Sequence, residues 1–228
     1  MQEGYFTSQT FGFLEALAAN NNRDWFQEHK ADYEAQVRQP ALTFISAMAD
    51  ELPAISPHFL AVPKKVGGSL MRVNRDIRFG KDKRPYKTNV GIQFRHEMGK
   101  DVHAPGFYLH IEANECFAGA GIWRPDAQAL GKIRDAIVDN PTAWLAARDD
   151  KRFSKHLTLE GESLRTYPRG YSKEHPLIDD IKRKDFIAVA ALTAQQVTSP
   201  KLLSTVLQQF EYAAPLMRFL CRALDVRY

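Results

Sequence analysis

Three residues with chemically useful side chains alternate along one segment of the chain: Tyr108, His110 and Glu112. Side chains two residues apart point to the same side of a β-strand, so we expect the three to share one face. Histidine titrates near physiological pH and serves as a general acid or base. The sequence therefore predicts proton transfer by His110, with Glu112 orienting it or binding a metal. The alternative is that the three form only the solvated outer face of an antiparallel sheet.

A cationic string precedes this segment and is the second group with chemical potential. Residues 64–87 hold nine Lys or Arg and two Asp, a local net charge of +7, whereas the whole chain is +4. Concentrated positive charge attracts anions, and Arg grips a phosphate or carboxylate through two hydrogen bonds. We therefore predict an anion-binding site. Its predicted ligand-binding residues are Arg72, Arg75, Arg78, Lys81, Lys83, Tyr86 and Lys87, together with Tyr108 of the row above.

Asp76 completes the predicted catalytic group with His110 and Glu112. It lies between Arg75 and Arg78 in the sequence. A carboxylate held between guanidinium groups stays ionised, so Asp76 suits the orienting of Arg or the binding of a metal better than the role of an acid. Capping of a turn is an equal alternative for this residue.

The cationic string also permits two readings without catalysis. A second basic segment, residues 164–186, interleaves cations with aromatic residues, a pattern that suits a nucleic-acid-binding module. Alternatively, the string is architectural, and its Arg and Asp residues interlock a loop with the helices around Trp25. We favour an anionic small molecule as the partner over nucleic acid.

Several other classes of site find little or no support in the sequence. No Walker motif, no Gly-x-Ser-x-Gly elbow and no dinucleotide-binding glycine pattern occurs. Cys116 and Cys221 are the only cysteines, so neither a disulfide framework nor a four-cysteine zinc site is expected. A set of His110, Glu112 and a distant His156 or His175 resembles in spacing a non-haem iron site, but that site normally sits in a double-sheet barrel. We therefore assign no metal ligand, and the cofactor stays open.

The periodicity of apolar residues predicts the elements that must position these groups. Helical spacing begins at residues 11–19, continues after an N-cap in residues 20–22, and resumes at Pro40. Two-residue alternation predicts strands over 70–75, 88–95, 106–112 and 116–122, with Gly119 and Gly121 leaving room for a close backbone or ligand. Helices are expected over 126–139, from 140 to 145 and over 200–225, and an edge strand over 158–160.

These elements predict an α+β fold in a single domain, residues 1–228. We expect an antiparallel sheet of about four or more strands, roughly residues 67–122, packed by N-terminal and C-terminal helices. The first few residues are set aside as a candidate for disorder. The chain shows no secretory signal and no apolar run of about 18 residues, so we expect a cytoplasmic protein without a membrane span.

Four strings in the chain resemble the family called domain of unknown function 2461. They are Asn21-Asn22-Arg23-Asp24-Trp25-Phe26, the string from Arg75 to Lys87, Gly119-Ala120-Gly121-Ile122-Trp123-Arg124-Pro125, and the later segment from Leu164 to Phe186. The resemblance extends from about Phe11 to about Leu220. It implies one continuous domain and brings no assigned reaction.

Overall fold

Alternating apolar residues build the strands of one antiparallel sheet. The computed structural model describes residues 4–78, 81–99 and 104–228, so the first three residues, for which we allowed disorder, lie outside the described residues. The strands are β1 (Phe59–Leu60), β2 (Asn89–His96), β3 (Gly106–Glu112), β4 (Cys116–Ile122), β5 (Thr158–Glu160) and β6 (Phe186–Ala191). Their order across the sheet is β1-β2-β3-β4-β6-β5, and every neighbouring pair is antiparallel. The predicted α+β class is confirmed.

The sheet differs from the predicted one at both edges. The strand expected over residues 70–75 is wrong, because only the isolated bridges Leu70↔Ile92 and Asn74↔Tyr86 form there. The second half of the chain supplies β5 and β6, so the sheet extends beyond residues 67–122. β6 escaped the alternation criterion because it is apolar on both faces, with Ile187 and Val189 half-buried opposite the fully covered Ala188.

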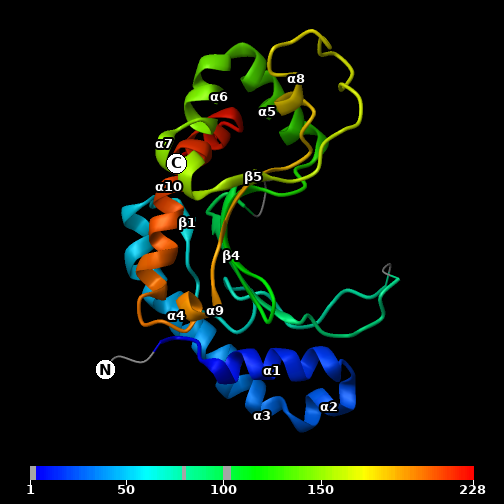
Figure 1. Cartoon of the computed structure of the whole chain (residues 1–228), viewed down its shortest axis with the longest axis vertical. Coiled ribbons are helices and arrows are strands. Elements are labelled where there is room, and N and C mark those ends of the chain that lie inside the picture. The colour runs from blue at the N-terminus through cyan, green and yellow to red at the C-terminus, as the bar shows by residue number, and fades with distance from the viewer. Residues whose placement is uncertain (1–3, 79–80, 100–103) are drawn as a thin grey trace.

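Helical segments flank this sheet (Figure 1). The helical segments are α1 (Ser8–Ala19), α2 (Arg23–Glu28), α3 (Lys30–Tyr33), the π-helical η1 (Glu34–Arg38), α4 (Gln39–Glu51), the short η2 (Leu52–Ala54), α5 (Ala127–Asp139), α6 (Pro141–Arg148), α7 (Lys151–His156), α8 (Ile178–Ile181), α9 (Ala194–Val197) and α10 (Leu202–Ala223). No helix among the described residues is both long and apolar enough to cross a bilayer.

The core lies between the sheet and α10. Phe94 and Phe107, from neighbouring strands, are fully buried and meet Phe210 of α10 at ring-centroid distances of 5.9 and 4.5 Å. Burying one such side chain contributes about 1.5–3 kcal/mol. Because the side chains alternate, this packing turns the other face of β2 and β3 away from the helix, and Figure 1 shows α4 and α10 on one side of the sheet only.

The N-terminal helices hold the base of the long segment that joins β1 to β2. The Asn22 side chain caps α2 by accepting a hydrogen bond from the Trp25 amide, as predicted for this asparagine run. Phe26 of α2 stacks on Tyr86 at 4.1 Å, while the Asn21 side chain bonds both backbone groups of Tyr86 at 3.0 Å. Residues 69–71 of this segment hydrogen-bond to β2, through the Met71 amide to the Gly91 carbonyl oxygen and the Gln93 amide to the Ser69 carbonyl oxygen.

Two glycines of β4 have different surroundings, which gives a test of the fold. Gly121 has φ +130°, and an added Cβ would lie 2.0 Å from the Phe186 carbonyl oxygen, so the neighbouring backbone needs this glycine. An added Cβ at Gly119 would make only ordinary contacts, the nearest 3.6 Å from the Phe117 ring.

We expect Gly121→Ala to lower the free energy of unfolding by at least about 1–3 kcal/mol, because the strained backbone and the clash cannot both relax. The matched variant Gly119→Ala should stay within about 1 kcal/mol of the wild type. Urea denaturation of both variants measures the difference. Equal midpoints for the two variants would contradict this account of the β4–β6 pairing.

Candidate functional site

The predicted row of polar side chains forms on the face of β3 opposite the buried residues Phe107, Leu109 and Ile111. Strand alternation points Tyr108, His110 and Glu112 to the same side, and all three are half-buried. The register places Gly91 of β2 and Phe117 of β4 on either side of His110. The site therefore depends on three neighbouring strands, with the histidine at its centre.

Both ring nitrogens of His110 have partners. Nε2 lies 3.3 Å from the Glu112 carboxylate, and Nδ1 lies 3.2 Å from the Tyr108 hydroxyl and 3.4 Å from Asn89 Nδ2. An ionised carboxylate only accepts hydrogen bonds, so Nε2–H donates to Glu112 in the neutral ring and Nδ1 accepts from Tyr108. The Thr88 hydroxyl holds the other Glu112 oxygen. The imidazole is therefore held between a hydrogen-bond donor and a carboxylate acceptor.

Ring packing fixes the plane of His110. The imidazole stacks on Phe117 with an interplanar angle of 4° and a centroid distance of 4.8 Å. An added Cβ on Gly91 would lie 2.7 Å from the Tyr108 hydroxyl oxygen, so the missing side chain at Gly91 makes room for the phenol. Preorganised side chains of this kind lose little entropy when they bind a ligand.

Burial raises the pKa of Tyr108 to about 12; a hydrogen bond from Asn89 opposes this rise, and the nearby Glu112 charge adds to it. The phenol therefore keeps its proton at neutral pH and acts as a hydrogen-bond donor.

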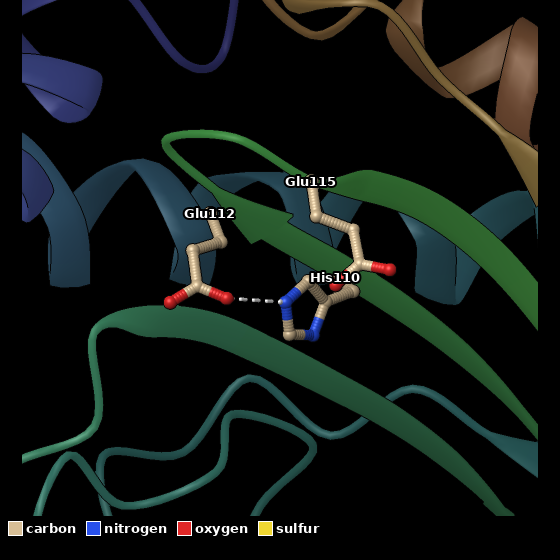
Figure 2. Close-up of side chains that lie close together, drawn as sticks. All are labelled: His110, Glu112 and Glu115. Carbon is tan, nitrogen blue, oxygen red and sulfur yellow. Dashed lines mark hydrogen bonds and ion pairs between the residues drawn. The ribbon is translucent and has the colours of Figure 1, made fainter.

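The β3–β4 hairpin adds Glu115, which sequence reasoning did not assign to the site. The Glu112 amide donates to the Glu115 carbonyl oxygen at 2.9 Å across a two-residue turn, so the two glutamates oppose each other. The turn was visible in the sequence, and counting its residues would have placed Glu115 on the face of His110. Figure 2 shows the three side chains gathered on this face.

His110, Glu112 and Glu115 each offer a ligand atom, and these atoms lie within 4.8 Å of one another. The iron-like set with a distant histidine does not form among the described residues, because His156 stacks on Tyr212 and His175 accepts a hydrogen bond from the Leu177 amide.

The cationic string folds into a loop whose ends are fastened together. The Arg75 amide bonds the Pro85 carbonyl oxygen at 2.9 Å, and the Lys87 amide bonds the Val73 carbonyl oxygen at 2.8 Å. Residues 79 and 80 of this string lie outside the described residues. Within the loop, Arg75 and Arg84 both pair with Asp82. Hydrogen bonds from Arg84 and then Arg75 hold the pKa of Asp82 well below its usual range.

Other charges of the loop are also bound within it. Asp76 accepts hydrogen bonds of 2.9 and 2.7 Å from the Arg78 guanidinium, which lowers the pKa of Asp76, so this carboxylate is ionised and orients Arg78. The Lys83 ammonium donates to the Ile77 carbonyl oxygen at 3.0 Å, and Lys81 is exposed. Tyr86 lies in the core against α2, so its ring faces the protein interior.

Arg72 and Lys87 lie near each other at the base of the loop. Lys87 is half-buried, and its pKa is lowered by burial and by the nearby charge of Arg72. Neither cation lies within ion-pair distance of a carboxylate in residues 4–78, 81–99 and 104–228. Arg84 connects the loop to the sheet electrostatically, because Asp82 raises the pKa of Arg84 and the Glu112 charge adds to that rise. The loop and the row are therefore neighbours.

The second basic segment is largely neutralised by its own surroundings. Lys182 pairs with Asp179, Lys184 with Glu162, and Arg183 lies 3.7 Å from the Asp180 carboxylate. These pairs reduce the positive charge that a nucleic-acid backbone would require.

A pocket of about 440 Å³ lies beside this segment and away from the polar row. Its lining residues are Arg124, Pro125, Leu130, Arg134, Glu162, Leu164, Lys184 and Asp185. The polar groups of this pocket already have hydrogen-bond partners within the protein. The carboxylate of buried Asp185 accepts hydrogen bonds from the backbone amides of Arg124 and Glu162, at 2.7 and 3.0 Å. The Arg134 guanidinium donates a hydrogen bond to the Ile181 carbonyl oxygen at 2.7 Å. We therefore place the candidate site at the polar row, where titratable groups converge.

Comparison with known proteins matches the chain to a family model. The model described as "Conserved hypothetical protein (DUF2461)" matches residues 9–219, nearly the full length of the resemblance found in the sequence. No curated protein and no solved structure matches the chain.

The elevated pKa of Tyr108 can be checked by titrating the phenols. A folded-state pKa of about 12, above the ordinary value of 10, means that the protonated phenol contributes stability below pH 10 that is lost as the pH rises through 12. Tyr108→Phe should remove one of eight tyrosines from the phenolate absorbance, specifically from the component that appears near pH 12.

Tyr171→Phe is the control, because Tyr171 also has a pKa raised to about 12 and lies outside the site. This variant should lose the same absorbance while leaving the nuclear magnetic resonance signals of His110 unchanged. If Tyr108→Phe removed absorbance near pH 10 instead, the proposed burial of this phenol would be wrong.

Proposed function

The chain belongs to the DUF2461 family of conserved hypothetical proteins, and we propose that it binds a small molecule carrying a phosphate or carboxylate group. The ligand lies on the polar face of β3, with Arg72 and Lys87 holding its anionic group. His110 transfers a proton to or from the ligand, and Glu112 orients the imidazole. This makes the protein a ligand-binding protein with the groups of an acid–base enzyme.

One observation motivates the proposal: half-buried Lys87 lies close enough to Arg72 to be affected by its charge, and no carboxylate among the described residues forms an ion pair with this lysine. Both burial and the neighbouring Arg72 disfavour the charged form of Lys87. An anion bound between Arg72 and Lys87 would relieve both effects, since opposite charge close to an ammonium favours its protonated state. Ionisable groups whose surroundings disfavour their charged form are typical of ligand sites.

The position of Lys87 supports a ligand that also reaches His110. Lys87 lies two residues before Asn89, the first residue of β2, so in extended backbone their side chains point to the same side. Asn89 in turn contacts the imidazole and the phenol of the polar row. An anionic group on Lys87 would therefore place the rest of a small molecule over Tyr108 and His110.

The remaining arginines of the loop act as supports in this proposal. Arg75 and Arg84 hold Asp82, and Arg78 holds Asp76, so these pairs stiffen the loop that presents Arg72. Exposed ion pairs of this kind contribute little stability, about 0–1 kcal/mol each, but several together restrict the loop's conformations. Lys81 and Lys83 supply long-range attraction for anions.

Binding of inorganic phosphate tests the proposal directly. Isothermal titration in chelator-treated, metal-free buffer should show saturable binding to the full chain. Arg72→Lys and Lys87→Gln should each weaken that binding about tenfold or more, because each removes a charge-assisted contact or its two-pronged geometry. Lys65→Gln is the charge-matched control, since Lys65 is exposed in the turn before the loop, and should leave the affinity unchanged.

Three outcomes separate the alternatives. Equal loss in Lys65→Gln, with a steep dependence on salt, would favour the nucleic-acid module. A lower melting temperature in Arg72→Lys with unchanged phosphate affinity would favour the architectural role. Absence of saturable phosphate binding to the wild type would overturn phosphate recognition, and a titration with acetate then tests the carboxylate class.

The lowered pKa of Lys87 also predicts how binding depends on pH. Only the ammonium form holds the anion, so phosphate affinity should fall as the pH rises through a value below the ordinary lysine pKa of 10.5. Lys87→Arg should keep its affinity to higher pH, because a guanidinium stays protonated there. Identical alkaline profiles for the wild type and Lys87→Arg would show that Lys87 is not the titrating group.

A further inference from the structure

We propose that His110, Glu112 and Glu115 form a binding site for one divalent transition-metal ion. The inference goes beyond anion binding, because it needs only the three side chains at the β3–β4 turn. The ligand set is one imidazole nitrogen and two carboxylate oxygens, a mixed set that suits zinc, manganese or ferrous iron better than magnesium or calcium.

The spacing of the ligand atoms fits a shared ion. With metal–ligand bonds of about 2.1 Å, two ligands of one tetrahedral ion lie about 3.4 Å apart. His110 Nε2 and the Glu112 carboxylate oxygen are 3.3 Å apart, which is long for a charge-assisted hydrogen bond and close to that separation. The Glu115 carboxylate lies within 4.8 Å of both and sits on an exposed side chain that can close the remaining gap.

The hairpin holds these three groups on one face by its backbone alone. His110 and Glu112 alternate along β3, and the bond from the Glu112 amide to the Glu115 carbonyl oxygen places the second glutamate opposite the first. Figure 2 shows both carboxylates near the imidazole. Three protein ligands with an open position are typical of a metal site that can also bind water or a substrate.

The charge of the cluster supports a cation at this place. Two carboxylates lie close together, and no Lys or Arg among the described residues forms an ion pair with either of them. Arg84 forms no ion pair with Glu112, but the negative charge of Glu112 contributes to the raised pKa of Arg84. Carboxylates this close repel each other when both are ionised, and a divalent ion between them removes the repulsion.

The side chains around the cluster would hold the ligands in place. The Thr88 hydroxyl donates to the Glu112 oxygen that faces away from His110. With Nε2 bound to a metal, the ring proton moves to Nδ1 and is donated to the Tyr108 oxygen, 3.2 Å away. Such partners fix the ring orientation of a ligating histidine and strengthen its binding. The Tyr108 hydroxyl proton then points away from the ring, toward the space where we place the ligand.

The metal would use Nε2 of His110, whereas the Tyr108 phenol contacts Nδ1. In the metal-loaded protein the ion would polarise the anionic ligand, while Arg72 and Lys87 keep their role. The two proposals therefore fail separately: phosphate binding is measured without metal, and metal binding is measured without phosphate.

Isothermal titration of the full chain with Zn²⁺, in phosphate-free buffer after chelator treatment, tests the site. We expect one equivalent to bind, and Mn²⁺ to bind the same site as measured by loss of the free-ion electron paramagnetic resonance signal. His110→Ala and Glu115→Gln should each weaken Zn²⁺ binding at least tenfold, and Thr88→Val about tenfold. Mg²⁺ in excess should not displace Zn²⁺.

His58→Ala is the matched control, because His58 also contacts a glutamate, Glu97, at 2.7 Å but belongs to no three-residue set among the residues that the structure describes. It should bind Zn²⁺ like the wild type. Glu115→Gln alters an exposed side chain, so the circular dichroism spectrum of this variant should match that of the wild type. Weaker Zn²⁺ binding by this variant would then reflect the lost ligand and not unfolding. The proposal is overturned if the wild type binds no Zn²⁺, or if Glu115→Gln binds one equivalent with unchanged affinity.

Discussion

The register of β3 between β2 and β4 is the constraint on which the rest of the structure depends. It places Phe107, Leu109 and Ile111 against the core and leaves the alternate residues on the opposite face. A slip of one residue would exchange the two faces, burying a histidine and two polar neighbours under α10. Because the apolar face packs against Phe210, the hydrophobic core itself holds the polar row in place. Core stability and site geometry are therefore one property of this sheet.

The charge of the long loop is distributed differently from what its composition suggests. Most of its arginines form ion pairs with the two aspartates within the loop, so much of the positive charge of this segment is neutralised locally. What distinguishes Arg72 and Lys87 is that they stand at the base of the loop, where the chain enters β2. The same ion pairs keep the loop in one conformation, and the double hydrogen bond from Asn21 to Tyr86 ties that conformation to the N-terminal helices.

The sequence predicted the elements whose patterns are local and missed those that depend on distant partners. Strands β2, β3 and β4 alternate clearly, and the asparagine cap of α2 has its own chemistry, so both were correct. β6 is apolar on both faces, and β1 has only two residues, so neither shows a period.

At the site, the row Tyr108, His110 and Glu112 followed from alternation alone. The burial of Tyr86 did not follow, because it depends on Phe26, which is sixty residues earlier in the chain. The pairs Asp76–Arg78 and Asp82–Arg84 share one spacing in the sequence, a local signal that indicates side chains turned toward each other.

The parallel stacking of His110 on Phe117 has a consequence for observing this site. Circulating π electrons of a phenyl ring shield nuclei that lie above its face, so the carbon-bound protons of this imidazole should be shifted upfield. His29 stacks on Trp25 and His156 on Tyr212 in the same way, so the His110→Ala variant is needed to assign the shifted signal of His110. Any occupant that tilts the imidazole changes the shielding, which makes the stacked pair a built-in reporter of occupancy.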